Sequence, residues 1–388
     1  MVCHLRKSLY GLKQASRAWN QKFTSFLKKF GFVENESDPC VFRLTKVDDL
    51  TILAIWVDDG LLCSSSKSTM MNLLKKLDEE FKISSHDIDY FVGIQIQRNR
   101  KEKSIHLSQS QYAKRILIKY KMEECNAKCI PSDPNTNLTM FVEDESVPET
   151  TPYRQVIGSL MYLMVCTRAD ISYAVGQVAQ FCQAPTIAHW KAVKRILSYI
   201  KGTSDYGVSF GGGESQNILT AYSDADFAND ITTRKSTTGY VLMFNQGPVS
   251  WRSKRQKCVA QSTTEAEYIA VSDCTKEVVW IRRLIAGLGF LQPYPTSLFC
   301  DNQSAIKLIK NPEFHQRSKH IDIKYHYVRE KFRDETITVV YVSTKDQLAD
   351  IFTKPLNSTS FTTLRNYLNT MFILREGVEN KQNHNCYS

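Results

Sequence analysis

The stretch ILTAYSDADFA, residues 218–228, begins the part of the chain whose pattern determines the fold. It is predicted to form a strand, and two strand-like stretches follow it, TGYVLMFN (238–245) and GPVSWRSK (247–254). A long helical pattern comes next at 262–289, and short strands and helices then alternate up to residue 354. Three strands followed by alternating helices and strands predict a mixed sheet with helices packed on it.

The elements after the third strand have clear boundaries. Ser262 and Glu265 form a capping-box pattern at the start of the long helix, which is expected to stop at 287–289. The later elements are predicted as a buried strand, a helix, a strand and a final helix: TSLFC (296–300), NQSAIKLIK (302–310), TITVVYV (336–342) and TKDQLADIFTK (344–354).

Four carboxylates lie on four of these elements. Asp224 is within the first strand, and Asp301 stands where a strand meets a helix, the position at which ligand groups gather in open α/β sheets. Glu267 and Asp350 lie in the early turns of two helices. Together they could hold two divalent cations about 3.5–4 Å apart for hydrolysis at phosphate. Each one alone is more typical of a solvated acid or a helix cap than of a metal ligand, so spacing by itself gives only weak support to a metal site.

The first 120 residues alternate helical and strand patterns. An amphipathic helix at 15–32 is expected to end at Gly31, and TILAIWVDDGLLC (51–63) has the pattern of a hairpin with Asp58, Asp59 and Gly60 at its turn. Adjacent carboxylates in that place could serve the turn alone or a two-metal site. A second helix at 68–81 and two strands joined by a basic turn at 90–109 complete this part.

Composition limits the class of protein. A chain of 388 residues has room for two or three domains. The net charge of +10 suits either a polyanionic partner or a solubilising surface. Eleven cysteines without a CxxC pair indicate reduced thiols of an intracellular protein, cytoplasmic or nuclear or both. No signal peptide and no apolar run of about 18 residues is present, so no membrane association is expected.

Four motifs of the second half resemble a known family. YSDADFA, TEAEYIA, FCDNQSAI and QLADIFTK, in this order, resemble the ribonuclease H domain of copia-type retrotransposon Pol polyproteins, and the resemblance is continuous from about 218 to 356. It implies that Asp224, Glu267, Asp301 and Asp350 form the catalytic and metal-binding set. It also implies two Mg²⁺ ions, for which Mn²⁺ can substitute. Asp226 is left outside this set, and Glu265 is assigned to helix capping.

The first half resembles the reverse transcriptase of the same family. LRKSLYGLKQASRAWNQKF, WVDDGLLC, DYFVGIQIQR and IHLSQSQYAKRIL are similar to its later palm and thumb-side segments, and residues 153–175 are similar to its connecting region. The resemblance implies that Asp58 and Asp59 belong to a polymerase metal site and that Gln14 lies near the incoming nucleotide. The family's palm has a further aspartate upstream of LYGLKQ, so the expectation here is an incomplete site without polymerase activity from this chain alone.

The predicted fold class is α/β and α+β, a truncated reverse-transcriptase palm and thumb followed by a ribonuclease H-like mixed sheet with flanking helices. The predicted parts are a partial palm and thumb-side segment, a linker or long loop, a helical connecting region, a ribonuclease H-like domain and a C-terminal tail: residues 1–130, 131–152, 153–215, 216–356 and 357–388.

The function that the resemblance implies is hydrolysis of the RNA strand of an RNA–DNA hybrid. Basic residues could hold the backbone of the duplex, or form only a solvated charged face: Arg252, Lys254, Arg255 and Lys319. The remaining portions of a Pol polyprotein are a further expected partner. The alternative is a catalytically inactive Pol remnant that at most binds nucleic acid or a protein partner.

Overall fold

The computed structural model describes residues 9, 11–46, 49–136, 138, 145–212, 217–311 and 322–370. The chain divides into two compact units, 1–92 with 280–291, and 93–279 with 292–388. The boundaries predicted at 130, 152, 215 and 356 all fall inside the second unit. Among the described residues, no helix has both the length and the apolar character that crossing a membrane requires.

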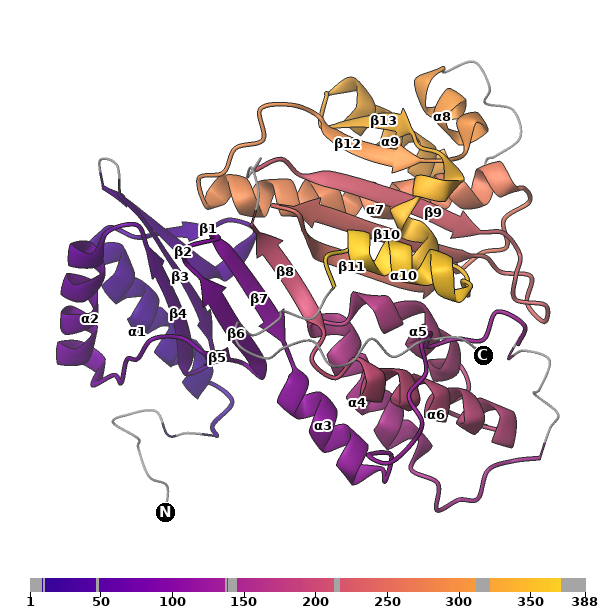
Figure 1. The fold of residues 1–388 in the computed structure, drawn as a ribbon. Helices are drawn as coiled ribbons and strands as arrows, with labels where there is room; N and C mark the ends of the chain where they lie inside the picture. Colours follow the sequence, from indigo (N-terminus) through magenta and orange to yellow (C-terminus); the bar gives the residue numbers. More distant parts are fainter. Residues whose placement is uncertain are drawn as a thin grey trace, which may run out of the picture. The chain divides into compact units, whose positions relative to one another are not determined.

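The first unit is built on an antiparallel sheet with the strand order β1-β2-β3-β4 (Figure 1). Helices α1 and α2 pack on one face of it, where Leu27 and Leu73 meet Phe42 and Leu53 in a single core. The expected end of α1 is confirmed, because Gly31 follows the helix with a φ of 100°. The bounds are α1 Ala15–Phe30, β1 Val33–Asn35, β2 Asp38–Lys46, β3 Asp49–Trp56, β4 Asp59–Ser64, α2 Lys67–Phe81 and β5 Tyr90–Phe91.

The hairpin between β3 and β4 differs from the prediction by one residue. Its two-residue loop is Val57–Asp58, whereas Asp59 pairs with Trp56 and Gly60 with Ile55 in the ladder. Burial determines this register, because a slip of one residue would turn the buried side chains of β3 to the other face. The register places Val57 at a φ of 56°, a conformation that β-branched residues rarely adopt.

The second unit contains the mixed sheet that the sequence predicts. Its strand order is β11-β10-β9-β12-β13, with β9, β10 and β11 antiparallel and with β12 parallel to both β9 and β13. The mixed α/β class is therefore confirmed. The bounds are β9 Thr220–Asp226, β10 Thr237–Phe244, β11 Gly247–Arg255, β12 Thr296–Cys300 and β13 Ile337–Tyr341.

Helices cover both faces of this sheet. Figure 1 shows α7 (Thr263–Gly287) behind the strands and α10 (Ser358–Tyr367) in front of them. The hydroxyl of Ser262 accepts a hydrogen bond from the Glu265 N–H at 3.1 Å, and the Glu265 carboxylate accepts one from the Gln261 N–H at 3.0 Å. The capping role of Glu265 is thus confirmed. Helices α8 (Gln303–Lys310) and α9 (Asp322–Arg333) contact β13.

The segment 344–354 is not the α-helix that its pattern suggested. It forms two short 3₁₀ helices, η4 (Thr344–Asp346) and η5 (Leu348–Phe352), separated by Gln347 in an extended conformation. Pro355 follows, and the residue before a proline disfavours the α conformation. The next helix, α10, lies in the segment predicted as a tail, and it packs into the core through Phe361 and Leu364.

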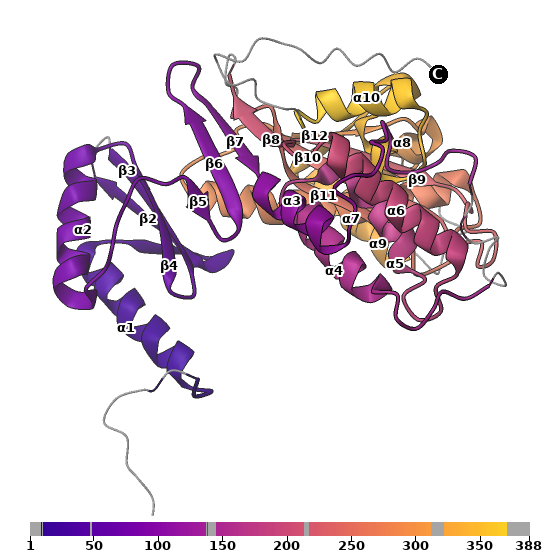
Figure 2. The same ribbon diagram turned by 60° about the horizontal axis from the view of Figure 1, so that its bottom comes forward.

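The region predicted to be helical is α4 (Tyr153–Cys166), η2 (Ala169–Ile171), α5 (Ser172–Ala179) and α6 (Ile187–Gly202). Figure 2 shows α4, α5 and α6 grouped together. They share one hydrophobic core with η5 and α10. The predicted helical region ends in a strand, β8 (Gly207–Gly211), which pairs with the hairpin of β6 (Ile94–Asn99) and β7 (Ser104–Ser108); α3 (Ser110–Lys119) follows that hairpin.

Candidate active site

The site lies where two neighbouring parallel strands diverge. The β9–β12 ladder ends at the pair Tyr222 and Phe299, just before Asp224 on one strand and Asp301 after the other. Strand ends at which neighbours separate are the usual ligand positions in α/β sheets. Helix α7 brings Glu267 to this edge, and η5 brings Asp350.

The four carboxylates are largely removed from water. Asp224, Glu267 and Asp350 have exposed fractions of 3%, 6% and 5%, and Asp301 is half-buried. Buried carboxylates are costly unless cations or hydrogen bonds compensate them. The Lys354 ammonium lies 2.9 Å from Asp350 Oδ1 and compensates part of the charge.

The pKa shifts show that the carboxylates act on one another. Burial, and then the charges of Asp224 and Asp301, raise the pKa of Glu267 well above its usual value. Burial and the charge of Asp224 raise the pKa of Asp350 to about 7. Burial alone would lower the pKa of Lys354, but Asp224 and Asp350 raise it. Asp224 is therefore electrostatically central to the group.

Hydrogen bonds fix two of the acids. The Thr353 hydroxyl, one turn after Asp350, donates to the Asp224 carboxylate. The Thr344 hydroxyl donates to Asp301 Oδ2 at 2.8 Å. Both donors come from the irregular segment 344–354. This segment therefore contributes Asp350 to the site and also holds Asp224 and Asp301 in place.

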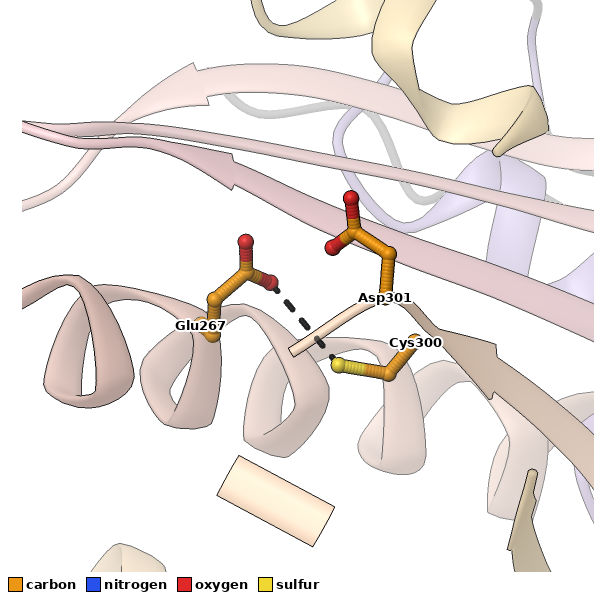
Figure 3. A group of neighbouring side chains, drawn as sticks. All are labelled: Glu267, Cys300 and Asp301. Atoms are coloured by element: carbon orange, nitrogen blue, oxygen red, sulfur yellow. Dashed lines mark hydrogen bonds between the residues drawn. The ribbon is translucent and has the colours of Figure 1, made fainter. Parts of the chain in front are cut away.

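Sequence reasoning missed the thiol in this group. Ligand atoms of Glu267, Cys300 and Asp301 all lie within 4.8 Å of one another, and the Cys300 thiol is 4.0 Å from Glu267 Oε2 (Figure 3). Burial, followed by the Glu267 charge, raises the pKa of Cys300 well above its usual value, so the thiol stays protonated. The available signal was its place at the buried end of a strand, directly before Asp301.

Asp226 is a further carboxylate beside this site. It follows Asp224 by two residues on β9, and alternation in a strand directs both side chains to the same face. Burial raises the pKa of Asp226 to about 6, and its Oδ2 is buried without a hydrogen-bond partner. A buried oxygen without a protein partner and a donor set of carboxylates fit a hard divalent cation such as Mg²⁺.

The other predicted site residues are spread over the chain. Arg252 and Lys254 are exposed on one side of β11, while Arg255 is on the opposite side and pairs with Asp230 at 2.6 Å. Lys319 lies outside the described residues. The remaining three predicted residues are exposed, one before α1 and two at the β3–β4 hairpin: Gln14, Asp58 and Asp59. Within the described ranges, the two hairpin acids join no group of three potential metal ligands.

We expect the stability of the metal-free protein to fall as the pH rises from about 4 to 7. The folded-state pKa of Asp350 is about 7 instead of 3.8, so the folded state binds more protons than the unfolded state. An acid with a raised pKa stabilises the fold below its unfolded pKa, and this contribution is lost as the pH passes the folded pKa. Thermal unfolding in EDTA measures it, and Asp350→Asn should flatten the profile. A transition temperature that rises over this interval would contradict the assignment.

Gly239 of β10 pairs with Asp224 of β9 in the sheet. Because glycine has no side chain, η5 can lie directly on the sheet at this point. A Cβ at Gly239 would lie 2.6 Å from Thr353 Cγ2 and 2.8 Å from Phe352 Cβ. Gly239→Ala should therefore destabilise the protein by about 1–3 kcal/mol through overpacking and displace Asp350.

Gly158→Ala is the matched control for this substitution. Gly158 is exposed in the middle of α4, and an added Cβ there meets nothing within 4 Å. Alanine should stabilise that helix by about 0.5–1 kcal/mol. Urea unfolding compares the two variants, and equal stability of both would show that η5 does not pack on Gly239.

Comparison with known proteins identifies the family. A family model described as reverse transcriptase (RNA-dependent DNA polymerase) matches residues 1–134. The chain is 42% identical over 368 residues to the retrovirus-related Pol polyprotein from transposon TNT 1-94 of Nicotiana tabacum, covering 93% of this chain and 28% of the relative. It is 40% identical over 361 residues to the corresponding protein from transposon RE2 of Arabidopsis thaliana, covering 93% and 24%. The chain thus spans about a quarter of these curated relatives.

Solved structures with a detectable likeness are distant. LC11-RNase H1 in complex with an RNA/DNA hybrid is 11% identical with a TM-score of 0.28, over 35% of this chain and 93% of that one. A foamy viral protease-reverse transcriptase in complex with double-stranded DNA is 13% identical with a TM-score of 0.45, over 87% and 60%. The family assignment rests on the sequence relatives. The chain belongs to the Pol polyproteins of copia-type retrotransposons.

Proposed function

We propose that this part of a copia-type Pol polyprotein is a ribonuclease that hydrolyses the RNA strand of an RNA–DNA hybrid with Mg²⁺. The observation that supports the proposal most strongly is the convergence of Asp224, Glu267, Asp301 and Asp350 from four separate elements, with two of their pKa values raised by the others. An arrangement that leaves buried negative charge undercompensated in the metal-free protein suits divalent cations.

The residues of the chain have distinct tasks in this proposal. Asp224, Glu267, Asp301 and Asp350 would hold the cations, and the charge of Asp224 acts on both Glu267 and Asp350. When bound, two Mg²⁺ ions supply activation of a water and stabilisation of the leaving oxygen on phosphate. Lys354 keeps its proton, because its pKa is raised, and it offsets part of the carboxylate charge.

Duplex binding would use the exposed basic side chains. Arg252 and Lys254 lie on the same side of β11 and can neutralise phosphates. Arg255 is paired with Asp230 and is less available for this contact. The discrimination of RNA from DNA would come partly from 2′-hydroxyl contacts across the minor groove.

Cleavage of matched duplexes tests the proposal. The full chain is incubated with Mg²⁺ and an RNA–DNA hybrid labelled on one strand or the other, or with a DNA duplex of the same sequence. We expect fragments from the RNA strand only. Binding of the hybrid by folded protein without any cleavage would contradict the proposal and favour the inactive Pol remnant. Cleavage of the DNA strand would contradict the assigned substrate.

Polymerase activity is not expected from this chain alone. Asp58 and Asp59 are exposed at the hairpin, and they join no third potential ligand within the described part of the chain. Coordination of Mg²⁺ depends on ligand number and geometry, so two acids alone should bind it weakly. Primer extension on an RNA template measures this activity, and efficient extension would contradict the expectation.

A further inference from the structure

Two buried glutamines join the elements that carry the carboxylates. Gln347 is fully buried, and its amide donates to the Ser223 carbonyl oxygen at 3.0 Å while its side-chain oxygen accepts from the Ala349 N–H at 3.2 Å. It thereby connects the residue before Asp224 with the residue before Asp350. One side chain thus fixes η5 against β9.

The hydrogen bond from Gln347 to Ser223 lies just beyond the point at which β9 stops pairing with β12. The β9–β12 ladder ends at Tyr222 and Phe299, one residue before Ser223, so no strand pairing with β12 holds β9 at the site. The Gln347 amide supplies a contact to β9 directly beyond the end of the ladder. The bond joins residues 124 positions apart in the sequence.

Gln256 makes a similar connection between the sheet and α7. Its amide donates to the Thr238 hydroxyl and to the Ala266 carbonyl oxygen, each at 3.0 Å, and the side chain is buried. It connects β10 with the residue before Glu267. Gln256 therefore fixes α7 against the sheet, as Gln347 fixes η5.

We propose that Gln256 and Gln347 are positioning residues that set the separation of Glu267 and Asp350 from Asp224, and thereby the affinity of the site for divalent cations. The inference rests on the proposed function, because it concerns the same carboxylates. Residues that orient metal ligands typically contribute about 10–100-fold to metal affinity or activity. Neither glutamine touches the reacting atoms in this account.

The test uses Gln256→Met and Gln347→Met in the full chain, since methionine keeps the size of the side chain and removes the amide. The matched control is Gln292→Met. Gln292 accepts from the Leu219 N–H and donates to the Asn217 carbonyl oxygen, both at 2.8 Å, before the start of β9 and away from the site. Mn²⁺ affinity is measured by electron paramagnetic resonance, together with kcat and KM for the hybrid and thermal unfolding without metal.

We expect each site variant to bind Mn²⁺ about 10–100-fold more weakly, with a lower kcat and a nearly unchanged KM, while Gln292→Met stays within about twofold of the wild type. Unchanged Mn²⁺ affinity in both site variants would overturn the inference, as would an equal loss in Gln292→Met. If the wild-type chain binds Mn²⁺ but does not cut the hybrid, the proposed function is refuted. The Mn²⁺ affinities of the variants still test the positioning role of the two glutamines in that case.

Discussion

Asp224→Asn should abolish hybrid cleavage and at the same time raise the unfolding temperature of the metal-free protein. Asp224 contributes to the raised pKa values of both Glu267 and Asp350, so its charge is repelled from two sides. Asparagine keeps the shape and can still accept from the Thr353 hydroxyl, but it removes one buried negative charge. The loss of activity should exceed the roughly 10–100-fold that an outer-shell residue contributes.

The opposite signs of the two effects make this result diagnostic. A substitution that merely damages the fold lowers both stability and activity. Loss of a metal ligand from a crowded group of carboxylates lowers only the activity. Asp273→Asn is the control, because Asp273 is on the same helix as Glu267 but is only paired with Lys276 at 3.3 Å. It should change neither quantity. Undiminished cleavage by Asp224→Asn would refute the assignment of the site.

Asp170→Asn should destabilise the fold by about 3–5 kcal/mol, because it leaves a buried arginine without its counter-charge. Arg168 is 1% exposed, and it donates to both Asp170 oxygens at 2.9 Å. The Tyr199 hydroxyl donates to Asp170 Oδ2 at 2.6 Å, and Arg365 of α10 donates to that hydroxyl at 3.4 Å. The network thus joins η2, α6 and α10.

A partly exposed pair of the same chemistry serves as the control. Arg195 Nη1 lies 3.3 Å from Asp133 Oδ2, with 27% and 38% of the two side chains exposed. Pairs of this kind contribute about 0–1 kcal/mol, so Asp133→Asn should be nearly neutral. Urea unfolding of the full chain measures both variants. Equal effects of the two substitutions would show that the Arg168–Asp170 pair is hydrated and not buried.

Much of the fold could be predicted because the relevant signals are local. Strand patterns at 218–254 and the helix after them determine the mixed sheet, and they place Asp224, Glu267 and Asp301 near one edge. Asp350 was predicted as a member of the set, but the α-helix predicted around it was wrong, because it lies in a 3₁₀ helix. The extended Gln347 interrupts the predicted α-helix, and its conformation depends on bonds to β9 that no local pattern contains.

Tertiary contacts determine the features that sequence reasoning missed. The hairpin loop is Val57–Asp58 and not the predicted turn of Asp58, Asp59 and Gly60, because the buried face of β3 fixes the register. The contribution of Cys300 to the site depends on the packing of α7 against β12. The positions of Gln256 and Gln347 follow from hydrogen bonds between distant segments. Spacing in one sequence contains no signal for such contacts.

The most direct test of the account is Mg²⁺-dependent cleavage by the full chain of an RNA–DNA hybrid labelled at one end of the RNA strand, with folding verified by a cooperative thermal transition. The account predicts a ladder of RNA fragments that disappears with EDTA and in Asp224→Asn. Intact RNA after incubation with folded wild-type protein and saturating Mg²⁺ or Mn²⁺ would contradict it.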